Sequence, residues 1–186
     1  GKKLPTTVLY GATTNNKIVQ YDNSKKMWNE LTNIVMPSNM STISKIYTHK
    51  IYLYILWSDN STENNNELWY YDMNKSSDSG KKAFETNNAT DFIVNDIQNE
   101  NNPVGFIIKQ GQLLSFNSNG PDTKSLNAST ASSLFIVPKK NGVNGVYWTN
   151  TEGQLNYYDG KKSTQVSGGD KINTVVSTID GKKLYY

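Results

Sequence analysis

The stretch Gly145–Asp159 reads Gly-Val-Tyr-Trp-Thr-Asn-Thr-Glu-Gly-Gln-Leu-Asn-Tyr-Tyr-Asp and has the pattern of one β-hairpin. Its two arms, Val146–Trp148 and Leu155–Tyr158, are rich in β-branched and aromatic residues, which favour strands. The polar residues between the arms end in Gly153, and a short polar loop with Gly is a hairpin turn signal. The stretch therefore predicts two antiparallel strands joined by a tight turn.

The same pattern occurs in four other places along the chain. They are Tyr10–Asp22, Leu56–Asp72, Gly105–Asn117 and Val175–Tyr186. The four complete copies of the hairpin pattern each end with an aromatic residue followed by an acid or an amide. These pairs are Tyr21-Asp22, Tyr71-Asp72, Phe116-Asn117 and Tyr158-Asp159. These pairs are spaced by 50, 45 and 42 residues. A period of this length, with three or four short strands in each copy, is typical of propeller blades.

We therefore expect an all-β fold, a β-propeller-like array of four to five short antiparallel blades. The chain forms one repeat domain with approximate units 1–40, 41–88, 89–129, 130–170 and a partial unit 171–186. The apolar strand ahead of each hairpin is expected to be innermost, and the Lys- and Ser-rich strand after it outermost. No segment has the apolar spacing of an amphipathic helix, so almost no helix is expected.

The first unit has no apolar strand ahead of its hairpin, which raises the question of how a ring closes. Ile172–Thr178 could supply that strand and pair the two ends of the chain. The alternatives are that the chain is a section of a longer propeller, or that several copies share one ring as a homo-oligomer. The strand Lys182–Tyr186 ends in apolar residues that a sheet edge should not expose, so we expect it to pair with the first unit or with another copy.

Composition excludes several classes of protein. The hydrophobic share is only 35%, but 12 Tyr, 5 Phe and 4 Trp supply the apolar area that a disordered chain lacks. All basic residues are Lys, and the absence of Arg argues against a dedicated nucleic-acid binder. The longest apolar run, Ile51–Trp57, suits a buried strand and is far shorter than the ~20 residues of a membrane span. No Cys is present, which removes thiol chemistry and zinc–thiolate sites.

No pattern of catalytic residues stands out. His49 is the only histidine, and a lone His beside a strand is expected to be structural. The loop Asp59–Glu67 places oxygen donors at alternate positions like a calcium loop, but it lacks the central Gly that a calcium loop needs. We therefore expect no enzymatic activity, no cofactor and no bound metal.

The hairpin Tyr147–Asp159 resembles blades of the fungal fucose-specific lectin type, and more loosely those of tachylectin and tectonin propellers. The tail Thr174–Tyr186 is similar. The resemblance implies sugar pockets between adjacent blades, each with an Arg before the first hairpin strand, a Glu or Gln in the second, and a Trp or Tyr. Gln20 falls on the Glu/Gln position, Ser115 and Asn156 take the same place in other units, and Gly145 or Lys183 stands where the Arg is expected.

Aromatic residues at blade margins are further candidates for stacking on the apolar faces of sugars. The expected ligand-binding residues are Gln20, Tyr21, Trp28, Trp69, Trp148, Asn156 and Tyr157. The leading interpretation is a lectin-like, non-enzymatic protein that binds glycans or glycoproteins through repeated shallow sites. We expect it to be extracellular or at the cell surface. A protein-interaction or structural propeller is the main alternative. An enzyme with an unmarked carboxylate pair is the third.

Overall fold

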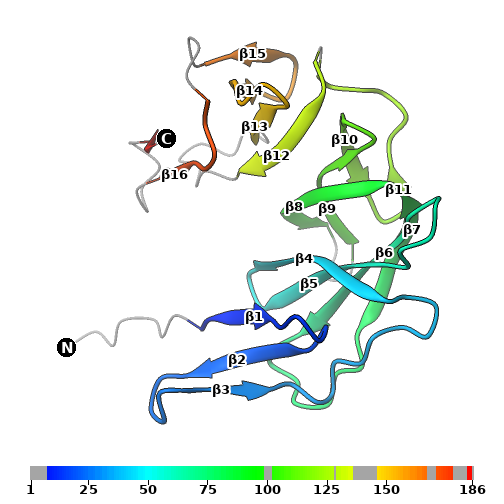
Figure 1. Cartoon of the computed structure of the whole chain (residues 1–186), viewed down its shortest axis with the longest axis vertical. Helices are drawn as coiled ribbons and strands as arrows, with labels where there is room; N and C mark the ends of the chain where they lie inside the picture. Colours follow the sequence, from blue (N-terminus) through cyan, green and yellow to red (C-terminus); the bar gives the residue numbers. More distant parts are fainter. Residues whose placement is uncertain are drawn as a thin grey trace.

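Consecutive antiparallel sheets follow one another along the chain and are arranged in an arc (Figure 1). The computed structural model describes residues 8–98, 102–127, 129–135, 146–166, 171–177 and 184–185. Within these ranges the chain is all-β and contains no helix. Each sheet is one blade, so the expected fold class is confirmed.

The blades follow the order of the sequence. The first holds β1 (Tyr10–Ala12), β2 (Ile18–Asp22) and β3 (Met27–Glu30). The second holds β4 (Thr42–His49), β5 (Tyr52–Ser58), β6 (Asn65–Asp72) and β7 (Lys81–Asn87). The third holds β8 (Ala89–Gln98), β9 (Asn102–Lys109), β10 (Gln112–Asn117) and β11 (Gly120–Pro121). The fourth holds β12 (Ala131–Phe135), β13 (Val146–Asn150), β14 (Leu155–Tyr158) and β15 (Ser163–Gln165). The fifth unit holds β16 (Val176–Ser177) and β17 (Leu184–Tyr185).

Within each sheet, neighbouring strands are also neighbours in sequence. The first strands of the second, third and fourth blades lie side by side, because β4 contacts β8 and β8 contacts β12. In these three blades the strand ahead of the hairpin is therefore innermost and the strand after it outermost, as expected.

The strands at the two ends of the array pair within their own units. β16 pairs with β17, which confirms a hairpin in the fifth unit. The idea that Ile172–Thr178 completes the first blade is wrong in this structure, since the described partner of β1 is β2. Among the described residues, β1 is the first strand of its blade, and it holds the position that β5 has in the second blade, since both strands lead directly into the hairpin turn.

Several strands extend beyond the apolar segments that predicted them. β6 already begins at Asn65, inside the polar loop Asp59–Glu67. β8 extends to Gln98 and β9 begins at Asn102, so both strands include polar residues. The polar segment after β10 contains the two-residue strand β11. Polar residues enter strands here because backbone pairing continues past the apolar core wherever a neighbouring strand is available.

The acid or amide that closes each hairpin has a local structural role. Its side-chain oxygen accepts a hydrogen bond from the backbone N–H two residues further on, at 2.8–3.0 Å, in all four complete copies. The acceptors are Asp22, Asp72, Asn117 and Asp159. This is the Asx-turn geometry that Asp and Asn favour. The repeated residue therefore starts the turn that leads to the outermost strand.

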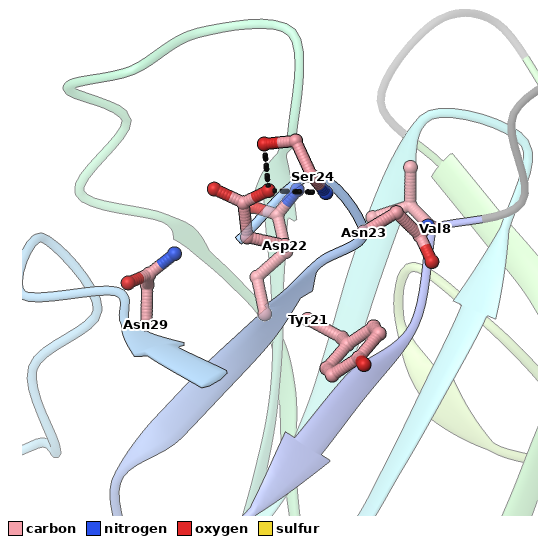
Figure 2. A pocket seen from close by; sticks show the side chains of 7 residues that line it. Val8, Tyr21, Asp22, Asn23, Ser24 and Asn29 are labelled. Atoms are coloured by element: carbon pink, nitrogen blue, oxygen red, sulfur yellow. Dashed lines mark hydrogen bonds between the residues drawn. The ribbon is translucent and has the colours of Figure 1, made fainter. Parts of the chain in front are cut away.

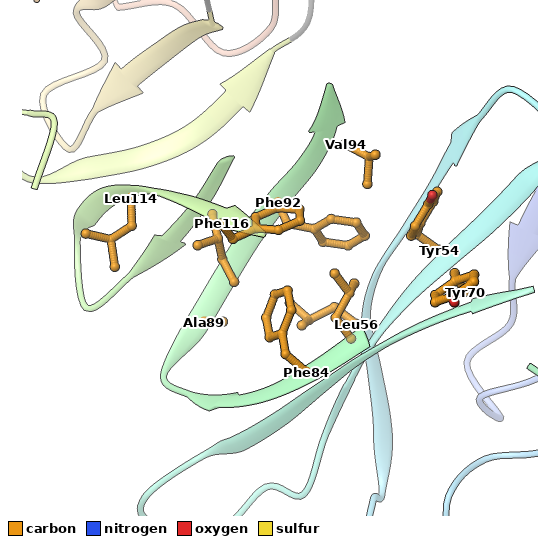
Figure 3. Close-up of a cluster of buried hydrophobic side chains, with 11 residues drawn as sticks. Tyr54, Leu56, Tyr70, Phe84, Ala89, Phe92, Val94, Leu114 and Phe116 are labelled. Carbon is orange, nitrogen blue, oxygen red and sulfur yellow. The ribbon is translucent and has the colours of Figure 1, made fainter. Parts of the chain in front are cut away.

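Each blade has an apolar forward face, toward the next blade, and an apolar rear face, toward the preceding one. Figure 3 shows the contact between the second and third blades, where Leu56 and Tyr70 on one forward face pack against Phe92 and Phe116 on the next rear face. The other faces of the same strands point the opposite way, because alternate residues of a strand lie on opposite sides. The rear face of the second blade packs Leu53, Ile55, Trp57 and Tyr71 against Ile18 of the first.

The fourth blade packs in the same way on the third, through Trp148, Val146, Ile108 and Leu113. A smaller cluster, in which Leu155 packs with Ile172 and Val175, joins the fourth blade to the fifth unit. Each of these clusters of buried apolar residues lies between two blades, so each blade depends on its neighbours.

Asp91 links three innermost strands near the middle of the arc. It is 8% exposed, forms an ion pair with Lys45 of β4, and accepts hydrogen bonds from the backbone N–H groups of Phe92 and Leu134 at 2.8 Å. Leu134 belongs to β12, so one carboxylate connects the second, third and fourth blades. A buried carboxylate requires such partners, because leaving it unpaired is costly.

We predict that Asp91→Ala lowers the free energy of unfolding by about 1–3 kcal/mol, since it leaves buried N–H groups without an acceptor. The matched control is Glu30→Ala, which removes the exposed Lys17–Glu30 pair and should change it by no more than about 1 kcal/mol. Urea unfolding followed by circular dichroism measures both. Equal losses in the two variants would contradict a structural role for Asp91.

A second stability prediction concerns Gly105 in β9. A Cβ at this position would collide with the carbonyl oxygen of Ile93 and lie 2.8 Å from the Phe116 ring. We expect Gly105→Ala to cost about 1–3 kcal/mol and to lower the Tm by roughly 2–4 °C for each kcal/mol. Gly11→Ala in β1 is the control, because its nearest atom, a Val19 methyl, is 3.3 Å away and can shift. A Tm for Gly105→Ala equal to that of the control would show that this close approach is not required.

Candidate functional site

A pocket of about 500 Å³ opens on the first blade, at the turn between β2 and β3 (Figure 2). Its described lining is Val8, Gln20, Tyr21, Asp22, Asn23, Ser24 and Asn29. These residues are exposed or half-buried, so the pocket is open to solvent. Three of them carry side-chain amides and one is a carboxylate, which makes the site polar with an aromatic edge.

The register of the sheet brings the polar residues together. Gln20 of β2 is paired with Asn29 of β3, so the two amides lie side by side on one face of the blade. Asp22 is two residues beyond Gln20 and therefore lies on the same face. The turn that follows Asp22 adds Asn23 and Ser24 to the rim.

Asp22 is held in place by its own turn. Its Oδ1 accepts hydrogen bonds from the Ser24 hydroxyl at 2.6 Å, the Ser24 backbone N–H at 2.8 Å and the Lys25 backbone N–H at 3.1 Å. These hydrogen bonds lower the pKa of the Asp22 carboxyl. The bond from the Ser24 hydroxyl has the largest effect, and the two backbone N–H groups lower the pKa further. All three bonds use Oδ1, which leaves Oδ2 as an acceptor for a ligand.

Tyr21 and Trp28 form an aromatic pair at the margin of this site. They are directly paired across β2 and β3, and their ring centroids are 5.2 Å apart at an interplanar angle of 59°. Tyr21 lines the pocket, whereas Trp28 lies on the rear face of the blade and is 49% exposed. The structure thus brings together three of the expected ligand-binding residues, Gln20, Tyr21 and Trp28, at one blade.

The other expected site residues lie elsewhere and do not form a common site. Trp148 is 1% exposed and packs between the third and fourth blades, so its expected place in a binding site is corrected to the core. Asn156 is 8% exposed and donates a hydrogen bond to the Gln154 carbonyl at 3.0 Å, which also gives it a structural role. Both residues are covered because the neighbouring strand and blade close over them.

Trp69 and Tyr157 are half-buried. The Trp69 indole donates a hydrogen bond to Glu67 at 2.7 Å and packs against the cluster between the first two blades. The Tyr157 ring lies 4.6 Å from that of Tyr147 on the forward face of the fourth blade. Neither lines the pocket on the first blade.

A smaller pocket of about 230 Å³ lies between the third and fourth blades. The third blade contributes Asn95, Val104, Gly105, Phe106, Ser115 and Phe116, and the fourth contributes Tyr158 and Gly160. Ser115 takes the same place in its blade as Gln20 does in the first. This pocket shows that two adjacent blades can share one opening.

Four polar lining residues of the larger pocket were not expected from the sequence: Asp22, Asn23, Ser24 and Asn29. Asp22 was recognised only as a marker of the repeat. Two features of the sequence could have indicated these residues. The polar turn Asn23-Ser24 follows shortly after Gln20, and the next strand contains the amide of Asn29.

The described residues contain no group of three or more His, Cys, Asp or Glu side chains that could hold a metal ion. The Asp59 loop satisfies its own carboxylate, which accepts hydrogen bonds from Ser61 and Asn65 at 2.8–2.9 Å. Across the described ranges, no helix has the length and hydropathy needed to cross a membrane.

Comparison with solved structures supports the fold. The chain is similar to a computationally designed β-propeller-like protein, Ika8, with a TM-score of 0.53 and 10% sequence identity. The match covers 95% of this chain and 51% of the designed one, so the chain spans about half of its length. The chain is an all-β, propeller-like array of blades. No family model and no curated protein matches its sequence.

The turn at Asp22 generates a prediction about pH. We expect the pKa of the Asp22 carboxyl to lie below its ordinary value of 3.8, because the Ser24 hydroxyl and two N–H groups favour the charged form. The charged Asp22 side chain therefore stabilises the turn fully when the pH is above the ordinary pKa. This stabilisation is lost as the pH falls through the lowered pKa. An NMR titration of the side-chain carboxyl carbon measures it, and Ser24→Ala should raise the pKa. An Asp22 pKa that does not move in Ser24→Ala would contradict this assignment.

Proposed function

We propose that the protein is a non-enzymatic carbohydrate-binding protein and that the pocket on the first blade is a sugar site. The observation that carries this proposal is the composition of the pocket. Amides, one carboxylate and one aromatic ring surround an open space of about 500 Å³. The described lining bears a single charge, on Asp22, so the pocket suits a neutral, hydroxyl-rich ligand.

Each polar group of the pocket has a counterpart on a sugar. The Asp22 carboxylate accepts hydrogen bonds from hydroxyl groups, and Oδ2 is oriented for this by the bonds that fix Oδ1. The amides of Gln20 and Asn29 both donate and accept, which matches the dual character of a hydroxyl group. Tyr21 lies on the opposite face of the sheet from Gln20 and Asn29, and at the margin of the pocket it offers an apolar surface to the C–H groups of a sugar ring.

The second pocket supports binding through more than one site. It combines the polar Asn95 and Ser115 with Phe106 and Tyr158, whose ring centroids are 5.9 Å apart. Shallow sites of this kind bind weakly one at a time, and several on one molecule gain affinity when the ligand is multivalent. Glycoproteins and cell-surface glycans are such ligands, and we place the protein outside the cell or at its surface for that reason.

Glycoside hydrolysis is not what this pocket favours. That chemistry uses two carboxylates at a fixed separation, and the described lining supplies one. The alternative of a protein-interaction propeller is favoured by a different observation, the exposed apolar side chains on the rear face of the first blade.

A glycan array followed by titration of the best ligand tests the proposal. We expect binding by the wild-type protein and a loss of about 3–10-fold in affinity for Gln20→Ala and for Asn29→Ala, the equivalent of about one hydrogen bond each. Gln112→Ala, an exposed Gln on β10 outside both pockets, is the matched control and should bind as wild type.

Two outcomes would contradict the site. The first is an array with no binding above background at any sugar. The second is binding that Gln20→Ala and Asn29→Ala leave unchanged, which would place carbohydrate recognition elsewhere on the molecule.

A further inference from the structure

The turns between strands lie at two opposite ends of the blades, and hydrogen bonds join the turns at one of these ends. Asn16 of the β1–β2 turn donates a side-chain hydrogen bond to the Ser41 carbonyl at 2.9 Å, and the Ser41 backbone N–H donates to the Ser58 carbonyl, next to the β5–β6 turn, at 2.8 Å. The β7–β8 and β11–β12 connections join the β9–β10 turn to the turns on either side in the same way. We call this the linked end.

The opposite end of the first two blades is rich in lysine. It contains the β2–β3, β4–β5 and β6–β7 turns, because consecutive antiparallel strands turn at alternate ends of a sheet. The last two turns are in contact, since the Met73 backbone N–H donates to the Ile51 carbonyl at 2.9 Å. The lysines of this end are all exposed and are Lys25, Lys26, Lys50 and Lys75. We call it the lysine end.

Exposed apolar side chains are concentrated at the same lysine end. Eight large apolar side chains of the described residues are exposed, and five of them are here, at 42–49% exposure: Val8, Leu9, Met27, Trp28 and Ile51. Val8 lines the same pocket as Asn23 and Ser24 of the β2–β3 turn (Figure 2). Exposed apolar groups that adjoin charged residues are typical of an interaction surface.

The tip of the β2–β3 hairpin combines both kinds of residue in the consecutive sequence Lys25-Lys26-Met27-Trp28. Met27 is paired with Asp22 and Trp28 with Tyr21, so the two apolar side chains lie on opposite faces of the blade. Both are 49% exposed, so the exposure of the tip does not depend on which face a neighbouring blade covers. The tip therefore presents apolar groups on both sides of two lysines.

The acids of the lysine end are held by their own turns. These turns contain three carboxylates, Asp22, Asp72 and Asp78. Each accepts a hydrogen bond from a backbone N–H of its turn, at 2.6–3.0 Å, and Asp72 also forms an ion pair with Lys75 at 3.4 Å. Within the described ranges, neither Lys25 nor Lys26 forms an ion pair. The two lysines at the tip are therefore available to an anionic partner.

We propose that the lysine end of the first two blades docks on the surface of a bilayer that contains anionic lipids. The lysines lie at the level of the phosphate groups, and Met27, Trp28 and Ile51 enter the boundary between headgroups and acyl chains. Lysines beside Trp and aliphatic side chains are the composition of such interfacial contacts. A soluble polyanion would use the lysines and leave the apolar side chains in water, so the combination favours a membrane.

The linked end has the opposite character, which fixes the orientation of the docked molecule. Its turns contain the acids Asp59, Glu63 and Glu152. Lys17, the lysine of the β1–β2 turn, is paired with Glu30 at 2.8 Å. The docked protein therefore points its linked end away from the membrane. The proposal is independent of the proposed sugar site.

Flotation with lipid vesicles tests the proposal. We expect the wild type to float with vesicles of phosphatidylcholine and phosphatidylserine and to bind much more weakly to phosphatidylcholine alone. Since one Lys near an anionic surface contributes about 5-fold in affinity, Lys25→Gln with Lys26→Gln should lower the affinity about 25-fold. Met27→Ser and Ile51→Ser should each lower it about 10-fold, because an apolar side chain no longer leaves water.

Two control variants lie at the linked end. Lys171→Gln removes an exposed lysine beside Gly153 of the β13–β14 turn. Val166→Ser removes an apolar side chain that is 47% exposed, next to Leu155 at the start of β14. Both should bind vesicles as the wild type does, and near-ultraviolet circular dichroism verifies that every variant is folded. Equal losses in the controls and in the tip variants would overturn the assignment of the surface.

Tryptophan fluorescence provides a second test in the unmodified chain. All four Trp lie in the described ranges, and only Trp28 is exposed. Vesicle binding should shift its emission to shorter wavelength, brominated lipids should quench it, and Trp28→Phe should abolish both effects. Binding without any change in emission would show that the tip does not enter the bilayer and would overturn the proposal.

Two further outcomes separate this proposal from its alternatives. A wild type that binds dextran sulfate but no anionic vesicles would assign the lysines to a soluble polyanion and overturn the membrane contact. Gln20→Ala should lose sugar affinity and still float with vesicles as the wild type does. A protein that binds anionic vesicles but no glycan would retain the membrane contact and reject the sugar site.

Discussion

The fold depends on the need to cover two apolar faces on every blade. Alternation along a strand gives the second blade Leu53 and Tyr71 on one side and Leu56 and Tyr70 on the other, all of them buried. A single sheet with both sides apolar has no stable solvent-exposed form. The structure satisfies this requirement by placing one blade against the next, so that the clusters of buried side chains lie between blades.

Polar groups determine where the chain turns and how the blades are aligned. The closing acid or amide of each hairpin accepts the N–H that begins the next turn. Asp91 joins three innermost strands through one carboxylate, and Asn66 accepts a hydrogen bond from the Ala89 N–H across the boundary between the second and third blades. Asp22 belongs both to such a turn and to the candidate site. Its Oδ1 accepts the hydrogen bonds of the turn, and its Oδ2 faces the pocket as an acceptor.

The sequence predicted the blades well because their period and their aromatic content are local properties. It predicted the site only in part. Trp28 and Trp148 both lie in strands, yet one is 49% and the other 1% exposed. The difference arises from whether another blade covers the residue, which no local pattern reveals. Asn29 reaches the pocket because of its pairing with Gln20, and that register becomes visible only when the strands are assembled.

The order of strands in each sheet has a consequence for how the molecule forms. Since the strands of the described residues pair with their neighbours in sequence, the contacts within a blade close only short loops, and chains with such local contacts fold quickly. Strand pairing within a blade can therefore begin as the chain leaves the ribosome, and the blade becomes stable once a neighbouring blade covers it. By the same logic, duplication or loss of one repeat changes the number of blades while the pairing inside each remains intact. Arrays of this kind can thus evolve in steps of one repeat.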